Sequence, residues 1–330
     1  MGAQRWSNSR VKIAVVIPAY NVEKHIQNVL ASIPNFVELI VVVDDASTDR
    51  TAEVVKKVKS SRVHIIEHPQ NKGVGGAMKS GYAFSYEQGA DIMVKIDGDG
   101  QMDPAFIQTL ISPILRSEAD YTKGNRFLHA RQLKLMPLIR RIGNLGLSFL
   151  AKLASGYWSI FDPTNGYTAI HRDVYALLNK DALAPDFFFE TSMLVQLRRA
   201  QAVVRDVPIP AIYGNETSNL SPLKSLITFT PRLIFNAFKR IIYQYYLYDF
   251  TAVSVYLLVG IPSIIFGFVW GLVKWRQSNL SGVVASTGTV LIAVLPIMTG
   301  IQFLTSAVSL DINSSPTISL QQIGARQDSL

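Results

Sequence analysis

Two carboxylates stand one residue apart, just after an apolar run in the first third of the chain. The segment KIDGDGQ spans residues 95–101 and contains Asp97 and Asp99. Carboxylates this close repel each other unless a cation lies between them, and Mg²⁺ or Mn²⁺ prefers such oxygen ligands together with water and phosphate. A solvated acidic turn is the competing interpretation, but the position at the end of a buried strand favours a metal site.

A second acidic pair, Asp44 and Asp45, ends another apolar run in the segment VDDASTD at residues 43–49. Ser47 or Thr48 can cap the helix that follows, although capping does not explain two acids at the end of a strand. A carboxylate at this place can accept a hydrogen bond from a base N–H, which uracil and guanine both offer.

For two further segments, the residue types are compatible with more than one function. Tyr20, in IPAYN at residues 17–21, is either a stacking face for a base or a core aromatic. The segment NKGVGG at residues 71–76 opens a helix and suits either phosphate binding or close backbone packing. Its glycines lack the spacing of a P-loop or of a dinucleotide fingerprint.

The elements that would position these residues alternate between strand and helix. Short β-branched runs predict buried strands at residues 12–18, 38–43, 63–67 and 92–96. Helical patterns lie at residues 22–33, 49–59, 74–88 and 104–116. This alternation predicts an α/β fold with a doubly wound, mostly parallel sheet. Ligands bind such sheets at the carboxyl ends of the strands, where both acidic segments fall.

The second half of the chain changes character. It continues with an amphipathic helix at residues 137–156, a helix and then a strand (202–209) within 186–212, and a basic, aromatic stretch at 224–249. Such a stretch before an apolar run suits a membrane interface, and an ordinary packed helix pair is the alternative.

Two uncharged apolar runs follow, at residues 251–273 and 282–310. Each exceeds the roughly 20 residues that cross a bilayer, with buried core helices as the alternative, and Lys274, Trp275 and Arg276 form the predicted break between them. We therefore expect four regions: a catalytic domain at 1–220, amphipathic juxtamembrane helices at 221–249, two transmembrane helices at 250–310 and a loose polar tail at 311–330.

The distribution of charge predicts the topology and narrows the partners. The cations Lys224, Arg232, Lys239 and Arg240 precede the first run, and residues 1–10 lack the apolar core of a signal peptide. The positive-inside rule then predicts an integral membrane protein with a cytoplasmic catalytic domain.

The net charge of +8 fits anionic lipid, phosphorylated substrates or nucleic acid, and clustering of the cations beside the apolar runs favours lipid over nucleic acid. The absence of cysteine excludes disulfides, thiolate metal sites and a cysteine nucleophile.

As an ordered set, these motifs resemble the family 2 inverting glycosyltransferases, which have the GT-A (Rossmann-like) fold. The later motifs and the two-span hairpin resemble the polyprenyl-phosphate glycosyltransferases within that family, which include dolichol-phosphate mannose synthases and bactoprenol glucosyltransferases. The resembling segments, in chain order, are PAYN at 18–21, DDASTD at 44–49, NKG at 71–73, DGDGQ at 97–101, GNRF at 124–127, DPTNGY at 162–167 and FFET at 188–191.

The resemblance implies roles for the matching residues. The residues that would bind the nucleotide are Pro18, Ala19, Tyr20, Glu23, Asp45, Lys72 and Asp97. The residues that would surround Mg²⁺ or Mn²⁺ are Asp97, Asp99 and Gln101. Family members often carry an acid directly after the Tyr-Asn pair, whereas here Val22 precedes Glu23.

Two anions must be held close together in such a reaction, which requires cations. Arg126 is the first candidate for the acceptor phosphate, and Arg140 and Arg141 are further candidates, with lipid headgroup contact as their alternative. Asp162 and Glu190 complete the expected catalytic set by orienting the acceptor or the sugar, and a general-base role for either stays open.

The expected reaction is inverting transfer of a hexose from a nucleotide-sugar, UDP-glucose first and GDP-mannose second, onto a polyprenyl phosphate such as undecaprenyl phosphate. The alternatives are a membrane-tethered binding protein without activity and a polysaccharide synthase, which usually has more spans. We also expect a homo-oligomer, such as a tetramer, with small contact points at Gly260, Gly267, Gly271, Gly282, Gly288 and Gly300.

Overall fold

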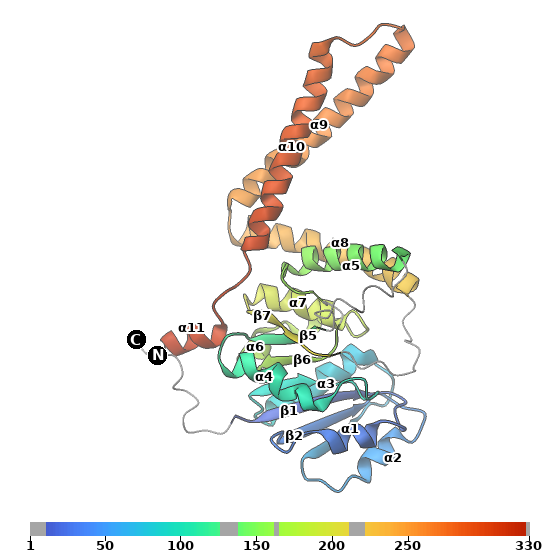
Figure 1. The fold of residues 1–330 in the computed structure, drawn as a ribbon, viewed down its shortest axis with the longest axis vertical. Coiled ribbons are helices and arrows are strands. Elements are labelled where there is room, and N and C mark those ends of the chain that lie inside the picture. The colour runs from blue at the N-terminus through green and yellow to red at the C-terminus, as the bar shows by residue number, and fades with distance from the viewer. Residues whose placement is uncertain (1–10, 126–137, 162–164, 211–221, 328–330) are drawn as a thin grey trace. The chain divides into compact units, whose positions relative to one another are not determined.

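The computed structural model describes residues 11–125, 138–161, 165–210 and 222–327 (Figure 1). The chain divides into two compact units. Unit 1 comprises Met1–Asn236 together with Pro316–Leu330, and unit 2 comprises Ala237–Ser315. The segment after the apolar runs therefore belongs to the same unit as the predicted catalytic domain.

Within the described residues of unit 1, seven strands form one sheet in the order β3-β2-β1-β4-β6-β5-β7. All neighbouring strands are parallel except for the pairs that involve β6. The predicted mostly parallel sheet is thus confirmed. The strands are β1 (Ile13–Ala19), β2 (Leu39–Asp44), β3 (Val63–Glu67), β4 (Ile92–Lys95), β5 (Tyr121–Asn125), β6 (Thr168–His171) and β7 (Val204–Pro208).

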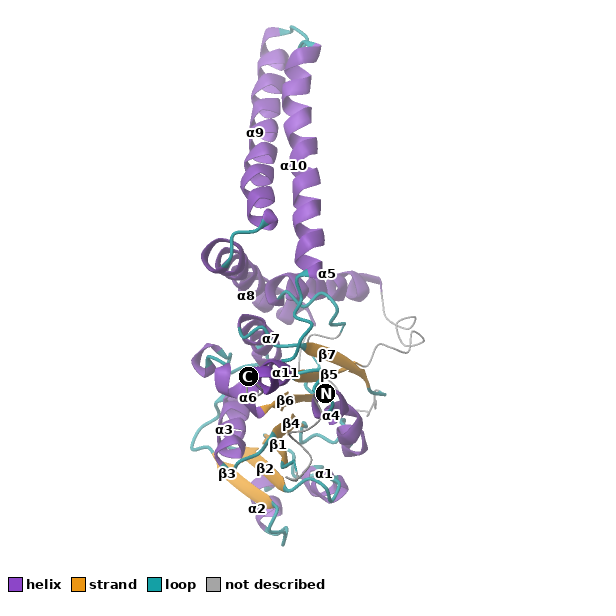
Figure 2. Ribbon diagram, turned by 90° about the vertical axis from the view of Figure 1, so that its left-hand side faces the viewer, coloured by secondary structure: helices purple, strands orange, loops and turns teal. Residues whose placement is uncertain are grey.

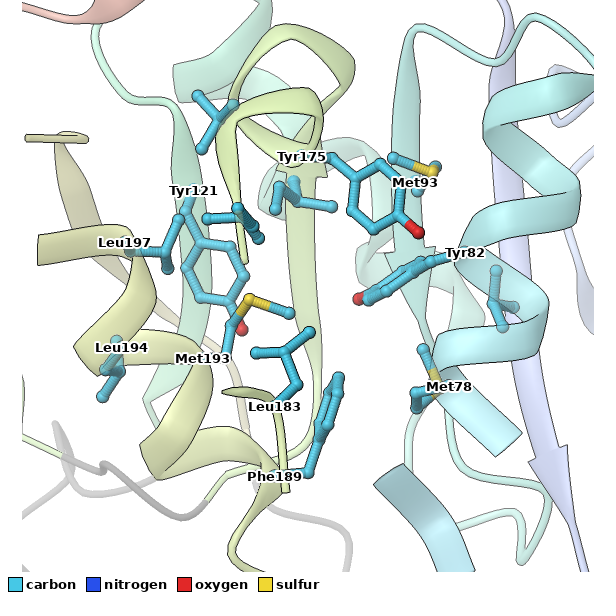
Figure 3. Packing of buried hydrophobic residues seen from close by; sticks show 14 of the residues in the cluster. Met78, Tyr82, Met93, Tyr121, Tyr175, Leu183, Phe189, Met193, Leu194 and Leu197 are labelled. Atoms are coloured by element: carbon cyan, nitrogen blue, oxygen red, sulfur yellow. The ribbon is translucent and has the colours of Figure 1, made fainter. Parts of the chain in front are cut away.

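Helices cover both faces of this sheet (Figures 1 and 2). Successive residues of a strand point to opposite faces. Val15 of β1 therefore packs with α1 (Ile26–Ser32) and α4 (Ile107–Leu115), whereas Val16 packs with α3 (Gly73–Glu87) and α7 (Phe189–Arg199). The second of these cores is rich in aromatic rings, and Figure 3 shows Tyr82 facing Tyr175 at a centroid separation of 5.8 Å. The other described helices that lie wholly within unit 1, apart from the tail, are α2 (Thr51–Lys56), α5 (Leu138–Ser155) and α6 (Arg172–Leu177), with one-turn helices at Pro104–Phe106 and Lys180–Ala182.

The sequence also predicts a strand at residues 121–124, which forms β5, but the antiparallel strand β6 is not predicted. Its four residues, Thr-Ala-Ile-His, are polar at both ends, so β6 lacks the apolar run that predicts the equally short β4. Thr168 pairs with Lys95 in the register between β6 and β4. Because β6 runs in the opposite direction, the residues that precede it lie at the edge where β4 ends.

The two apolar runs form a pair of long helices in unit 2, α9 (Ala252–Ser281) and α10 (Thr287–Asn313). Both are long and apolar enough to cross a bilayer, with mean hydropathy of 2.2 and 1.9 over their most apolar windows. The predicted break at Lys274–Arg276 is wrong, because α9 continues to Ser281 and ends at Gly282 in the left-handed conformation. Helix α8 (Pro222–Ile242) and a π-helical turn (Tyr243–Tyr248) precede this hairpin.

Small residues bring α9 and α10 close together. A Cβ atom added at Gly267 would lie 2.5 Å from the Ala293 carbonyl oxygen, and one added at Gly300 would lie 2.7 Å from the Gly260 carbonyl oxygen. Side chains at these positions would force the helix backbones apart. Gly260, Gly267 and Gly300 are therefore used inside the hairpin, and they no longer support the prediction of an oligomer.

A buried ion pair joins the end of α8 to the end of α10 within unit 2. Arg240 donates to the two carboxylate oxygens of Asp311 from Nη1 and Nη2, both at 2.8 Å, and the Tyr245 hydroxyl donates to the same carboxylate. A planar guanidinium and a carboxylate match in this two-bond geometry. The interfacial cation Arg240 is therefore a structural partner of the hairpin.

The prediction of a loose tail is wrong for residues 316–327. Helix α11 (Leu320–Gln327) follows α10, and the backbone before it binds the turn between α4 and β5. The Ser319 hydroxyl donates to the Ser117 carbonyl at 2.6 Å, and the Leu320 N–H lies 3.0 and 3.1 Å from the two carboxylate oxygens of Asp120. A buried carboxylate requires donors, and the tail supplies one of them.

Truncation tests this contact. A chain that ends after Ser315 loses the donors to Asp120 and Ser117, each worth about 1 kcal/mol. We expect the thermal midpoint of unit 1 to fall by several degrees, at roughly 2–4 °C per kcal/mol. A chain that ends after Gln327 keeps these hydrogen bonds and serves as the control in the same melting experiment. Equal midpoints for the two truncations would contradict a docked tail.

Candidate active site

The carboxyl ends of β1, β2 and β4 lie side by side, because β1 pairs with both of the other strands. Ala19 at the end of β1 is in register with Asp44 at the end of β2, and Val16 is in register with Lys95 at the end of β4. Both acidic segments of the sequence therefore leave the sheet at one edge.

The loop after β1 presents an aromatic side chain and is held by the loop after β2. Tyr20 is 49% exposed, which excludes the interpretation as a core aromatic and leaves its ring open for stacking. Asn21 adopts the left-handed conformation (φ 55°), and its Oδ1 accepts a hydrogen bond from Thr48 N at 2.8 Å. Glu23 accepts from Arg50 N at 3.0 Å, so its carboxylate joins the two loops.

Asp45 lies at the centre of a buried hydrogen-bond network. Its side chain is only 4% exposed. One carboxylate oxygen, Oδ1, accepts from the backbone N–H of Lys72 at 2.9 Å and lies 2.6 Å from Nδ1 of His68. The other ring nitrogen of His68 lies 2.9 Å from the Ser80 hydroxyl on α3. The network fixes the Asp45 carboxylate between β2, β3 and the start of α3.

The glycine-rich start of α3 serves close backbone packing. The N–H groups of Gly75 and Gly76 donate to the Pro185 carbonyl at 2.8 and 3.1 Å, in the segment before α7. A Cβ atom added at Gly75 would lie 2.1 Å from the Ala184 carbonyl oxygen. Of the two functions open from the sequence, the structure therefore favours packing over phosphate binding for these two amides.

A buried lysine connects the acidic loop after β4 to α7. Lys95 Nζ lies 2.5 Å from Oε1 of Glu190 and 3.2 Å from Oδ1 of Asp97. Burial alone would lower the pKa of the Lys95 ammonium, but the carboxylates of Asp97 and Glu190 raise it by more, so the pKa lies above its ordinary value. Lys95 therefore stays charged, and it brings together two residues that were predicted separately.

Glycines let the acidic loop pack against its neighbours. A Cβ atom added at Gly98 would lie 3.5 Å from the Pro18 carbonyl oxygen, so this loop touches the end of β1. A Cβ atom added at Gly166, just before β6, would lie 2.6 Å from Lys95 Nζ and 3.1 Å from Oδ2 of Asp97. A side chain at residue 166 would therefore press on the Lys95 ammonium and the Asp97 carboxylate.

The second acid of the pair, Asp99, is also partly exposed. Asp99 Oδ1 accepts from Gln101 N at 3.0 Å, and Gln101 itself is exposed. Among the residues that the structure describes, no group of three or more His, Cys, Asp or Glu side chains is placed to hold a metal ion. The described donors for a cation are thus the carboxylates of Asp97 and Asp99, which are hard oxygen ligands of the kind that Mg²⁺ and Mn²⁺ take.

Several predicted residues lie outside the described part of the chain. Arg126 and Asp162 belong to segments that the structure does not describe, and only the backbone is described for Arg140 and Arg141 in α5. Their predicted roles stay predictions.

Sequence reasoning also missed two residues, His68 and Lys95. His68 directly follows the end of β3, and Lys95 is the last residue of β4. The rule that placed Asp45 and Asp97 at strand ends could have found both.

Residues 14–178 match the glycosyl transferase family 2 domain, and this chain belongs to that family. The match contains both acidic segments, His68 and Lys95. The GT-A fold expected for the family agrees with the mixed, mostly parallel sheet described above.

Curated relatives of the chain include enzymes that act on lipid phosphates. The UDP-N-acetylglucosamine–dolichyl-phosphate N-acetylglucosaminyltransferase of Methanococcus voltae is 35% identical over 216 residues, which cover 61% of this chain and 86% of that protein. The dolichol-phosphate mannosyltransferase of Pyrococcus furiosus is 26% identical over 270 residues, which cover 79% and 72%. The undecaprenyl-phosphate mannosyltransferase of Micrococcus luteus is 26% identical over 204 residues, covering 60% and 83%.

A solved structure with the same fold is glucosyl-3-phosphoglycerate synthase from Mycobacterium tuberculosis in complex with Mn²⁺, UDP-glucose and phosphoglyceric acid. It superposes with a TM-score of 0.52 at 22% identity, over 70% of this chain and 79% of that one. At this identity the likeness establishes the fold alone.

The packing of α3 against the segment before α7 is testable with two glycines. Gly75→Ala places a methyl group against the backbone of that segment, and such overpacking costs about 1–3 kcal/mol. We expect a lower thermal midpoint. Gly146→Ala in α5 is the matched control, since a Cβ atom there meets nothing within 4 Å. If both variants melt at the wild-type temperature, the close contact is absent.

Proposed function

We propose that this chain transfers a hexose from a UDP-sugar to a polyprenyl phosphate, with inversion at the anomeric carbon. The observation that carries the proposal is that a family 2 domain, with acids at the ends of β2 and β4, precedes two helices of bilayer length in one chain. A lipid acceptor explains why these elements occur together. The dolichyl- and undecaprenyl-phosphate acceptors in the names of the relatives support the same acceptor class.

For the donor, we propose a division of roles between the two acidic loops. Tyr20 offers a stacking face to the base, and the buried Asp45 carboxylate is fixed where it can accept a base N–H. Asp97 and Asp99 would hold Mg²⁺ or Mn²⁺ with help from Gln101, and the diphosphate and water would complete its coordination. The ion, when bound, would neutralise the departing diphosphate.

The acceptor needs little activation. A lipid phosphate monoester has a second pKa near 6, so it is largely a dianion at neutral pH. One phosphate oxygen attacks the anomeric carbon while the bond from that carbon to the diphosphate breaks, and UDP leaves. We propose that Arg126, with Arg140 and Arg141, holds the acceptor phosphate against the repulsion of the second anion. Asp162 would orient the acceptor or the sugar.

The sugar is proposed from two sources. UDP-glucose is the donor expected from the resemblance to bactoprenol glucosyltransferases, and the Methanococcus relative is named for UDP-N-acetylglucosamine. Both carry the same nucleotide, which the proposed base contacts fit. The two apolar helices would span the membrane with the catalytic unit on the cytoplasmic side, and a homo-oligomer remains part of the proposal.

A transfer assay tests the activity. Detergent-purified protein is incubated with undecaprenyl phosphate, Mg²⁺ and one labelled donor at a time: UDP-glucose, UDP-N-acetylglucosamine or GDP-mannose. We expect label in the organic phase with a UDP-sugar, and loss of at least 100-fold in Asp99→Asn or in EDTA, since the ion stabilises the leaving charge. Full turnover in EDTA would contradict the metal site, and label from GDP-mannose alone would contradict the UDP-sugar.

The stereochemistry tests the single displacement. A direct attack by lipid phosphate on an α-linked donor inverts the anomeric carbon, so the product should be β-linked. The anomeric proton coupling in the NMR spectrum of the lipid-linked sugar distinguishes the two linkages. An α-linked product would contradict a single inverting displacement.

A further inference from the structure

Three charged side chains meet at the end of β4: Lys95, Asp97 and Glu190. That of Asp97 is partly exposed, and the other two are buried. The Asp97 side chain is 32% exposed, whereas those of Lys95 and Glu190 are 2% and 9% exposed. Lys95 reaches Asp97 from below at 3.2 Å and Glu190 at 2.5 Å. The ammonium thus lies between a carboxylate of the site and a carboxylate of α7.

Stability alone is a weak explanation for this lysine. Taking an ammonium and a carboxylate out of water costs several kcal/mol per ion, and an apolar pair of similar volume is often as stable. The Lys95 side chain is only 2% exposed, and a Cβ atom added at Gly166 would lie 2.6 Å from its ammonium. The buried ammonium of Lys95 is therefore not explained by the stability of the core alone.

We propose that Lys95 is a positioning residue, which fixes the Asp97 carboxylate for the metal-bound diphosphate; this inference rests on the proposed function. By binding Oδ1 of Asp97, the ammonium restricts the rotation of the side chain that faces the donor. Residues that orient a metal ligand in this way typically change metal affinity by about 10–100-fold when they are removed.

The same geometry defines the part of Glu190. Its carboxylate oxygen Oε1 is 2.5 Å from the Lys95 ammonium and is almost wholly enclosed. A carboxylate that neutralises an ammonium at this distance is poorly suited to accept a proton from substrate. Glu190 therefore anchors Lys95. Because Glu190 lies at the start of α7, the same ion pair also connects the end of β4 to the segment before α7, which packs against α3.

Calorimetric titration of UDP, with Mn²⁺ and separately with EDTA, tests the proposal. In Lys95→Met, we expect the affinity for UDP in Mn²⁺ to fall about 10–100-fold, while the affinity in EDTA stays close to that of the wild type. Glu190→Gln is the matched variant. It keeps Lys95 beside Asp97, so its loss in Mn²⁺ should be smaller.

Lys95→Met leaves Glu190 buried without a counter-ion, which can disturb folding. The double variant Lys95→Met/Glu190→Gln removes that charge, yet Asp97 still lacks its ammonium. We expect the double variant to melt near the wild-type temperature and to keep the weak affinity in Mn²⁺. Wild-type affinity in the double variant would make Lys95 a mere counter-ion of Glu190 and overturn the proposal, as would equal losses with Mn²⁺ and with EDTA.

Titration of the wild-type protein distinguishes a failure of the proposed metal site from a failure of the role of Lys95. If wild-type protein binds UDP no better in Mn²⁺ than in EDTA, the proposed metal site fails, and the role of Lys95 fails with it. If the wild type shows the Mn²⁺ dependence and Lys95→Met shows it equally, only the role of Lys95 is overturned.

Discussion

Burial of β1, β2 and β4 on both faces is the constraint on which the rest of this structure depends. Strands that are covered by helices on each side have no room for free polar side chains along their length. Polar groups can leave the sheet only where the strands end. Parallel pairing then brings the ends of β1, β2 and β4 to one edge, so that segments far apart in sequence share a site.

A second layer of polar groups lies beneath this edge and holds the Asp45 and Asp97 carboxylates in place. His68 binds Asp45 on one side of the site, and Lys95 binds Asp97 on the other. Each buried group must find a partner, because an unpaired charge or donor in the interior costs several kcal/mol. The same contacts tie β3, α3 and α7 to the loops that they support. The contacts that satisfy the buried polar groups are thus the same contacts that keep the site rigid.

Close backbone packing and a paired buried charge also hold unit 2 together. Glycines at the contact between α9 and α10 allow close approach of the helix backbones. At the end of the hairpin, the buried guanidinium of Arg240 is matched by the Asp311 carboxylate with two hydrogen bonds. The basic residues near the apolar helices therefore divide between surface and structural positions, which composition alone does not distinguish.

The sequence by itself determined the elements whose patterns are local. The β-branched runs defined β1 to β4 to within one residue at each end, the acids fell at strand ends as expected, and the apolar runs defined α9 and α10 approximately. The tertiary structure decided what depends on distant partners. The antiparallel strand β6 is short and takes its direction from β4, and the tail is ordered by the buried Asp120 carboxylate some two hundred residues earlier in the chain. The glycines at the start of α3 donate to the Pro185 carbonyl, and Lys95 joins Asp97 to Glu190. A residue's type and its neighbours in sequence predict burial and period, but the partner of a buried charge is chosen by the fold.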